Sequence, residues 1–143
     1  MKKWVFLLWF GLVLSNPAGV FADYSGQWLA TVTESVNRCE GTGKMELDDY
    51  KLTIDHEGND IKIVIMEHVA QRIYKGDIDP ERPRNIQVQY TKYIYEGGYV
   101  SEEVEITFES DRRGQGQSVW SRSDGYRQCG GRFEFVLEKT RPQ

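Results

Sequence analysis

Apolar and polar residues alternate along most of the chain with the period of two that indicates half-buried β-strands. The clearest stretch is residues 103–109, where Val104, Ile106 and Phe108 alternate with three glutamates and a threonine. Turn signals rich in Gly, Asn, Asp and Pro separate such stretches, and helical periodicity is nearly absent. The pattern predicts eight strands, near residues 25–35, 44–55, 60–67, 70–78, 85–96, 99–109, 116–122 and 129–140.

Short connections join the predicted strands, so neighbours in sequence are expected to pair as an up-and-down antiparallel meander. One connection, from Glu57 to Asp60, places Gly58 where a hairpin turn needs a positive φ. We predict that the meander closes into a small barrel, because closure removes the exposed edges of the first and last strands. An open sandwich is the alternative. In either case the fold class is all-β.

The first 22 residues have a different pattern from the rest of the chain. They begin with two lysines, continue with an apolar run of 11 residues and end in a small-residue site at Ala22. These are the three parts of a secretory signal peptide. The run is shorter than the roughly 20 residues that cross a bilayer as a helix. We therefore expect residues 1–22 to be removed and residues 23–143 to fold as one secreted or periplasmic domain with no remaining membrane span.

The two cysteines, Cys39 and Cys129, are expected to form a disulfide, because an exported chain folds in an oxidising compartment. Cys39 follows the first predicted strand and Cys129 opens the last. If these strands pair antiparallel, the two cysteines meet at the closing seam, within the Cα separation of about 5–6 Å that a disulfide needs. Two free thiols or a metal-binding pair are the alternatives. The distance between the cysteines is thus a test of barrel closure.

The first predicted strand opens with Gly26 and Trp28 in a G-x-W spacing. This resembles the signature of the calycins, the group of lipocalins, fatty-acid-binding proteins and avidins. In that group the Trp closes one end of the barrel and an Arg of the last strand packs across it. With the two cysteines opposite one another, Trp28 faces position 140, so the resemblance implies Arg141 as its barrel-closing partner. The stretch from Trp120 to Gly131 is also similar to small bacterial secreted β proteins.

Charge narrows the choice of partners. Two of the 18 basic residues lie in the predicted signal peptide, which leaves 16 basic against 22 acidic residues and a net charge of −6. An acidic surface repels phosphate backbones, so we expect no nucleic-acid partner. Outward positions of the predicted strands carry glutamates instead of an apolar band, so we predict a soluble barrel and not a transmembrane one.

The sequence contains no nucleophile elbow, phosphate loop, calcium loop or metalloprotease motif, so we expect no catalysis, no cofactor and no metal. His56 and His68 fall in or near turns, and nothing clusters them with the cysteines. We interpret both histidines as solvated turn residues. Glu103, Glu105 and Glu109 form a carboxylate row that the alternation assigns to the solvent face, where catalytic carboxylates are not expected.

An aromatic group in the second half of the chain is the best candidate for a binding site. Its members are Tyr90, Tyr93, Tyr95, Tyr99 and Trp120. Pointing inward they would line a cavity for a small apolar ligand, and pointing outward they would form a patch for a protein partner. They could also simply fill the core. We predict a non-catalytic binding protein for a small apolar ligand. The alternative is a secreted protein–protein interaction module, such as an inhibitor of another extracellular or periplasmic protein.

Overall fold

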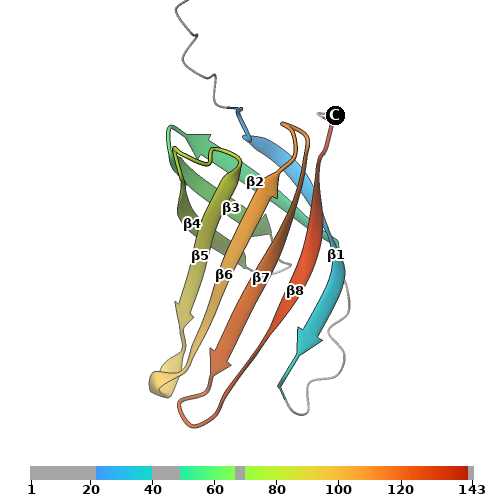
Figure 1. Cartoon of the computed structure of the whole chain (residues 1–143). Helices are drawn as coiled ribbons and strands as arrows, with labels where there is room; N and C mark the ends of the chain where they lie inside the picture. The colour runs from blue at the N-terminus through green and yellow to red at the C-terminus, as the bar shows by residue number, and fades with distance from the viewer. Residues whose placement is uncertain (1–21, 40–48, 67–69, 142–143) are drawn as a thin grey trace, which may run out of the picture.

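The computed structural model describes residues 22–39, 49–66 and 70–141, and these form a closed antiparallel barrel (Figure 1). The strands follow one another around the barrel in chain order, and the last pairs with the first. A short 3-10 turn, η1 (Tyr95–Gly97), joins the fifth strand to the sixth. The strands are β1 (Gly26–Asn37), β2 (Asp49–Glu57), β3 (Asp60–Met66), β4 (Gln71–Ile78), β5 (Asn85–Tyr93), β6 (Tyr99–Phe108), β7 (Arg113–Ser123) and β8 (Gln128–Lys139).

The predicted all-β fold is confirmed, and so are the eight-stranded meander and its closure into a barrel. The predicted signal peptide lies outside the described residues except for Ala22, as does the predicted start of the second strand. Across the described ranges, no helix is long and apolar enough to cross a bilayer.

The alternation of the sequence decides which side chains form the core. Val104, Ile106 and Phe108 of β6 point inward and are buried, while the residues between them are exposed. The β2–β3 turn also follows the prediction, because Gly58 has a φ of 63°, which a residue with a side chain adopts only at a cost. The core is therefore a column of inward side chains from successive strands.

The disulfide predicted at the closing seam is present. The Cα atoms of Cys39 and Cys129 are 5.1 Å apart, and β1 pairs with β8 along the strands that precede and follow them. Near the disulfide, Asn37 faces Gly131, which is the register that a direct pairing of the two cysteines predicts. The seam is thus closed by backbone hydrogen bonds and by a covalent link.

Farther along the seam, the register differs from the prediction by one residue. The pairing shifts between Val32 and Glu34, so that Thr33 is the extra residue of a β-bulge. As a result Trp28 faces Lys139 and not position 140. The Lys139 ammonium lies 5.7 Å from the centre of the Trp28 ring, and the exposed Arg141, named as its partner from the calycin resemblance, lies two residues farther along.

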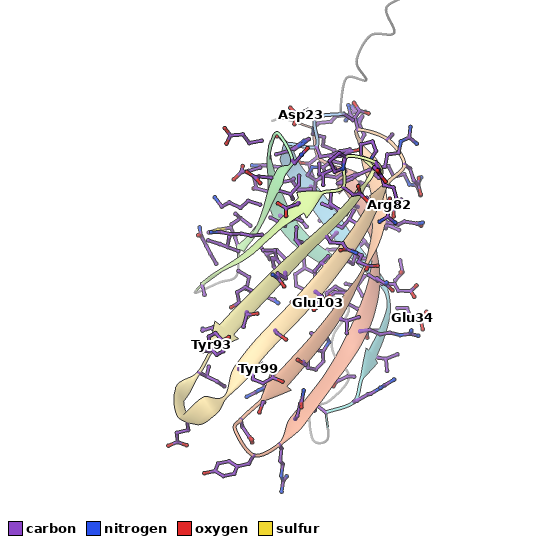
Figure 2. The ribbon with its side chains drawn as sticks, turned by 60° about the vertical axis from the view of Figure 1, so that its left-hand side comes forward. Asp23, Glu34, Arg82, Tyr93, Tyr99 and Glu103 are labelled. Atoms are coloured by element: carbon purple, nitrogen blue, oxygen red, sulfur yellow. A yellow bond between two sulfur atoms is a disulfide. The ribbon has the colours of Figure 1, made fainter. Side chains whose placement is uncertain are left out.

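Aromatic side chains close the barrel end near Asp23, the upper end in Figure 2. Trp28 is fully buried, and its indole Nε1 donates a hydrogen bond to the Tyr24 carbonyl at 2.9 Å. The Tyr24 ring stacks on Phe108 with 3.8 Å between centroids and lies 5.7 Å from His56. The His56 side chain is 7% exposed, so its interpretation as a solvated turn residue is wrong. His68 lies outside the described residues.

The ladder between β4 and β5 is shorter than any other around the described barrel. It joins Lys75–Ile78 to Ile86–Gln89. Beyond Lys75 the strands diverge, so Gln71–Tyr74 and Tyr90–Tyr93 do not pair with each other (Figure 2). β5 nevertheless stays in register with β6 as far as Tyr93. In this part of the wall, any link between β4 and the rest of the barrel on that side must come from side chains.

Candidate functional site

A cavity of about 230 Å³ lies inside the barrel. Its wall is mainly apolar, and inward-facing residues from all eight strands contribute to it. The closed end with Trp28 and Phe108 does not contribute. The residues of the wall are Ala30, Tyr50, Leu52, Ile63, Ile65, Arg72, Tyr74, Val88, Val100, Glu102, Val104, Ile106, Trp120, Phe133 and Phe135.

A buried carboxylate, that of Glu102, stands in this apolar wall and is 5% exposed. Its Oε1 accepts a hydrogen bond of 2.6 Å from the Ser118 hydroxyl. Its Oε2 accepts one of 2.6 Å from the Tyr74 hydroxyl and one of 3.2 Å from Nη1 of Arg72. A buried charge is tolerated where a counter-ion and hydrogen-bond donors surround it, and Glu102 has both.

Tyr74 remains a hydrogen-bond donor over a wide pH range. Burial raises the pKa of the Tyr74 phenol, and the neighbouring carboxylate of Glu102 raises it further, although the Arg72 guanidinium opposes both effects. The neutral phenol therefore keeps its proton and donates a hydrogen bond to Glu102. The group formed by Arg72, Tyr74, Glu102 and Ser118 is called the Glu102 cluster below. Its hydrogen bond from Tyr74 to Glu102 is kept at neutral and moderately alkaline pH.

The Glu102 cluster bridges the place where the β4–β5 ladder ends. Arg72 and Tyr74 lie on the unpaired part of β4, whereas Glu102 lies on β6, beyond β5. Between them Tyr90 of β5 faces Glu102 in register, and its ring centre is 5.4 Å from that of Tyr74. Side-chain contacts thus connect β4 to β5 and β6 where backbone pairing does not.

Trp120 lines the cavity from β7. Its partner in register on β8 is Gly131, where an added Cβ would lie 2.9 Å from indole atoms and 2.2 Å from the Val36 carbonyl oxygen. The glycine therefore leaves the space that the ring occupies. The indole Nε1 is buried and has no hydrogen-bond partner among the described residues. A buried donor left unpaired costs about 1–3 kcal/mol.

The structure separates the four described side chains of the aromatic group that the sequence brought together. Trp120 lines the cavity, and Tyr90 is half-buried and packs against the core. Tyr93 is 82% exposed, and the hydroxyl of Tyr99 accepts a hydrogen bond of 2.8 Å from Gln128. Both lie where β5 ends and β6 begins, far from the closed end of the barrel (Figure 2). The side chain of Tyr95 lies outside the described residues.

The phase of the strands explains this separation. Tyr90 faces Glu102, which points inward, so Tyr90 lies on the inward side of β5. Tyr93 faces Tyr99 and lies on the opposite side of the strand. The register runs without a shift from Asn85 to Tyr93, so no bulge brings Tyr93 back to the inside. Of the predicted aromatic group, only Tyr90 and Trp120 therefore belong to the barrel interior among the described side chains.

No residue of the Glu102 cluster was predicted from the sequence. The signal for Glu102 was available, because the phase that buries Val104 and Ile106 also places position 102 inside. The same holds for Ser118, two residues before Trp120 on β7. Both residues are polar, and a glutamate in a strand is ordinarily expected to face solvent. Their inward position was therefore not predicted.

Within the described ranges, no three His, Cys, Asp or Glu side chains gather so that they could hold a metal ion. No protein-family model matches the chain, and neither a curated protein nor a solved structure matches it.

Proposed function

We propose that this protein is a non-catalytic binding protein that holds one small, largely apolar molecule inside its barrel. The observation that carries the proposal is the apolar cavity of about 230 Å³, whose wall includes residues of every strand. An apolar cavity of about 150 Å³ is known to hold benzene, so by proportion this cavity has room for roughly nine non-hydrogen atoms. The size favours a molecule with one ring over a long-chain lipid.

The state of the buried carboxylate supports binding over catalysis. A general base must accept a proton from its substrate, so donors already bound to its carboxylate oxygens compete with that role. Both oxygens of Glu102 already accept hydrogen bonds, from Ser118 on one side and from Tyr74 and Arg72 on the other. The Glu102 cluster therefore serves as a rigid polar part of the wall.

A calorimetric titration of the full chain with benzene, isopropylbenzene and naphthalene tests the proposal. The decisive variant is V104F, because Val104 lines the cavity and a larger side chain there fills it. V119F is the matched control, since Val119 is an exposed valine on the neighbouring strand β7. We expect at least one probe to bind, V104F to weaken it tenfold or more and V119F to leave it unchanged (about 1.4 kcal/mol separates these outcomes).

Absence of binding by every probe would contradict the proposal, and so would equal binding by V104F. In that case the alternative of a protein-interaction module gains weight. One observation favours it: Tyr93 and Tyr126 are 82% and 90% exposed, at the ends of two neighbouring hairpins. Exposed tyrosines are typical of protein–protein interfaces.

A further inference from the structure

We propose that a groove on the outer face of the barrel, beside the β1–β8 seam, binds a short acidic segment of a partner protein. The segment places a carboxylate between Arg38 and Arg132 and an apolar side chain on the floor of the groove. The inference goes beyond the proposed function and does not depend on it, because the groove is formed by outward-facing residues and the cavity by inward-facing ones.

The groove lies where β7 ends, β8 begins and β1 ends, and its volume is about 320 Å³. Strand alternation decides which side chains border it. Val119 and Ser121 stand on either side of the inward Trp120, so both face outward, and Arg132 precedes the inward Phe133. The groove, called the seam groove below, has as its outward-facing residues Val36, Arg38, Val119, Ser121, Gly130 and Arg132.

The floor of the seam groove is apolar and uncovered. A Cβ at Gly130 would lie 2.5 Å from the backbone oxygen of Trp120, so a side chain does not fit at this position. Beside it Val119 is 54% exposed, and Val36 borders the groove from β1. An apolar side chain of a partner can therefore lie over Gly130 and cover Val119, which is how apolar surface in protein interfaces is buried.

Two arginines give the seam groove its charge. Arg38 and Arg132 are exposed, and neither forms an ion pair with an acidic side chain of the described residues. By contrast Arg82, near the closed end, is paired with Asp79. Of the described residues that line the groove, none is acidic, and Glu103 faces Val119 from β6 outside it. Guanidinium groups bind carboxylates through paired hydrogen bonds, so a carboxylate is the group that this site favours.

The backbone holds the two arginines in place before a partner arrives. The N–H of Arg38 donates a hydrogen bond of 2.9 Å to the carbonyl of Gly130, and the disulfide of Cys39 and Cys129 follows directly. Arg132 faces Val36 in register on β1. Because the chain that carries both arginines is already fixed, binding costs less conformational entropy than it would on a free loop.

The charge of the neighbouring outer face limits the size of the partner's acidic part. Exposed residues in cross-strand register form an acidic row around the barrel, with glutamines on β5 and β7 and no cation. Its five carboxylates belong to Asp60, Asp77, Glu105, Glu134 and Glu34. A nucleic acid or an anionic membrane would extend over this row and be repelled. A protein segment of a few residues meets the arginines alone.

A displayed library of random seven-residue peptides, selected on the full chain, tests the proposal. We expect the selected peptides to be enriched in Asp and Glu next to Leu, Ile or Phe. The variant R38S/R132S should bind the best of these peptides about fivefold or more weakly, because two exposed ion pairs are lost. The matched control is R84S/R112S, which removes the same charge at two exposed arginines outside the groove and should bind as the wild type does.

Two further measurements locate the peptide. In ¹⁵N–¹H spectra it should shift the amide signals of Val119, Ser121 and Arg132 and leave that of Gly58, in the β2–β3 turn, in place. Binding should weaken as the salt concentration rises, because the charges that carry it are exposed. The cavity variant V104F should bind the peptide like the wild type, so this inference and the proposed function can fail separately.

The result that overturns the inference takes one of three forms. Selection yields no peptide or peptides without acidic residues; R38S/R132S binds the selected peptide as tightly as the wild type; or the shifted amides lie away from the seam groove. Heparin and vesicles of phosphatidylcholine with phosphatidylserine are titrated in parallel. Binding of either one through Arg38 and Arg132, with no peptide bound, would show that the groove takes a larger polyanion and would overturn the assignment to a protein segment.

Discussion

A carboxylate occupies an inward position of this barrel because three donors meet it there. Glu102 shares the phase of Val104 and Ile106, and its carboxylate is hydrogen-bonded to Ser118, Tyr74 and Arg72. The apolar wall and the polar cluster thus depend on one another. A polar group in the wall is tolerated only while each of its hydrogen-bond partners remains in place.

Replacing Glu102 tests this dependence. E102A leaves the Tyr74 and Ser118 hydroxyls and the Arg72 guanidinium without their common acceptor, so we expect a loss of about 3 kcal/mol in the free energy of unfolding. The control is E103A, at the next residue of β6, whose side chain is exposed (Figure 2). Urea unfolding should place E103A within about 0.5 kcal/mol of the wild type. Equal losses in the two variants would show that the cluster contributes nothing to stability.

Tyr74 makes a contribution to the free energy of unfolding that declines at alkaline pH. Burial, with the Glu102 carboxylate beside it, raises the pKa of Tyr74 above its ordinary value of 10.0 in the folded protein. The unfolded chain therefore loses this proton at a lower pH than the folded chain does. The contribution to stability is complete below pH 10.0 and is lost as the pH rises above that value.

Unfolding by urea between about pH 9 and about pH 11.5 measures this decline. Y74F should be less stable than the wild type at neutral pH and should decline less steeply above pH 10.0. Y126F, at a tyrosine that is 90% exposed, should retain the wild-type slope. A slope that Y74F leaves unchanged would mean that Tyr74 loses its proton as readily in the folded as in the unfolded chain.

At the scale of the strands, the sequence predicts what depends on alternation and on turns. The β2–β3 hairpin was predicted because Gly58 interrupts two apolar runs, and the seam because Cys39 and Cys129 flank the strands that close it. The bulge at Thr33 was not predictable in this way. Apolar and polar residues continue to alternate through Val32 and Thr33, so nothing in the pattern marks the extra residue.

The gap between β4 and β5 is likewise invisible in the sequence. Gln71–Tyr74 and Tyr90–Tyr93 are good strand sequences, and both form strands. Whether they pair with each other depends on how far the sheet twists and opens, which is a property of the closed barrel and not of either segment. The Glu102 cluster lies across this gap, so the candidate site could be located only once the pairing of all strands was known.

At the scale of the whole molecule, we expect the cavity to keep its shape without the disulfide of the β1–β8 seam. The disulfide closes a loop of 90 residues, and a loop of that length restricts the unfolded chain strongly, worth roughly 4 kcal/mol in the chain-entropy account. The folded seam does not depend on it alone, because β1 and β8 pair from Trp28–Lys139 to Asn37–Gly131. Cys39 and Cys129 are also absent from the wall of the cavity.

Reduction of the Cys39–Cys129 bond should therefore lower the melting temperature by roughly 10 °C or more while the reduced, still folded protein binds its probes with nearly unchanged affinity. The double variant C39S/C129S removes the bond without a reductant and should behave in the same way. Calorimetric melting and probe titration measure the two effects on one sample. A melting temperature that does not change would mean that the seam link does not restrict the unfolded chain. Loss of probe binding at a temperature where the barrel is still folded would mean that the disulfide shapes the cavity itself, which is the dependence that the backbone pairing of β1 with β8 argues against.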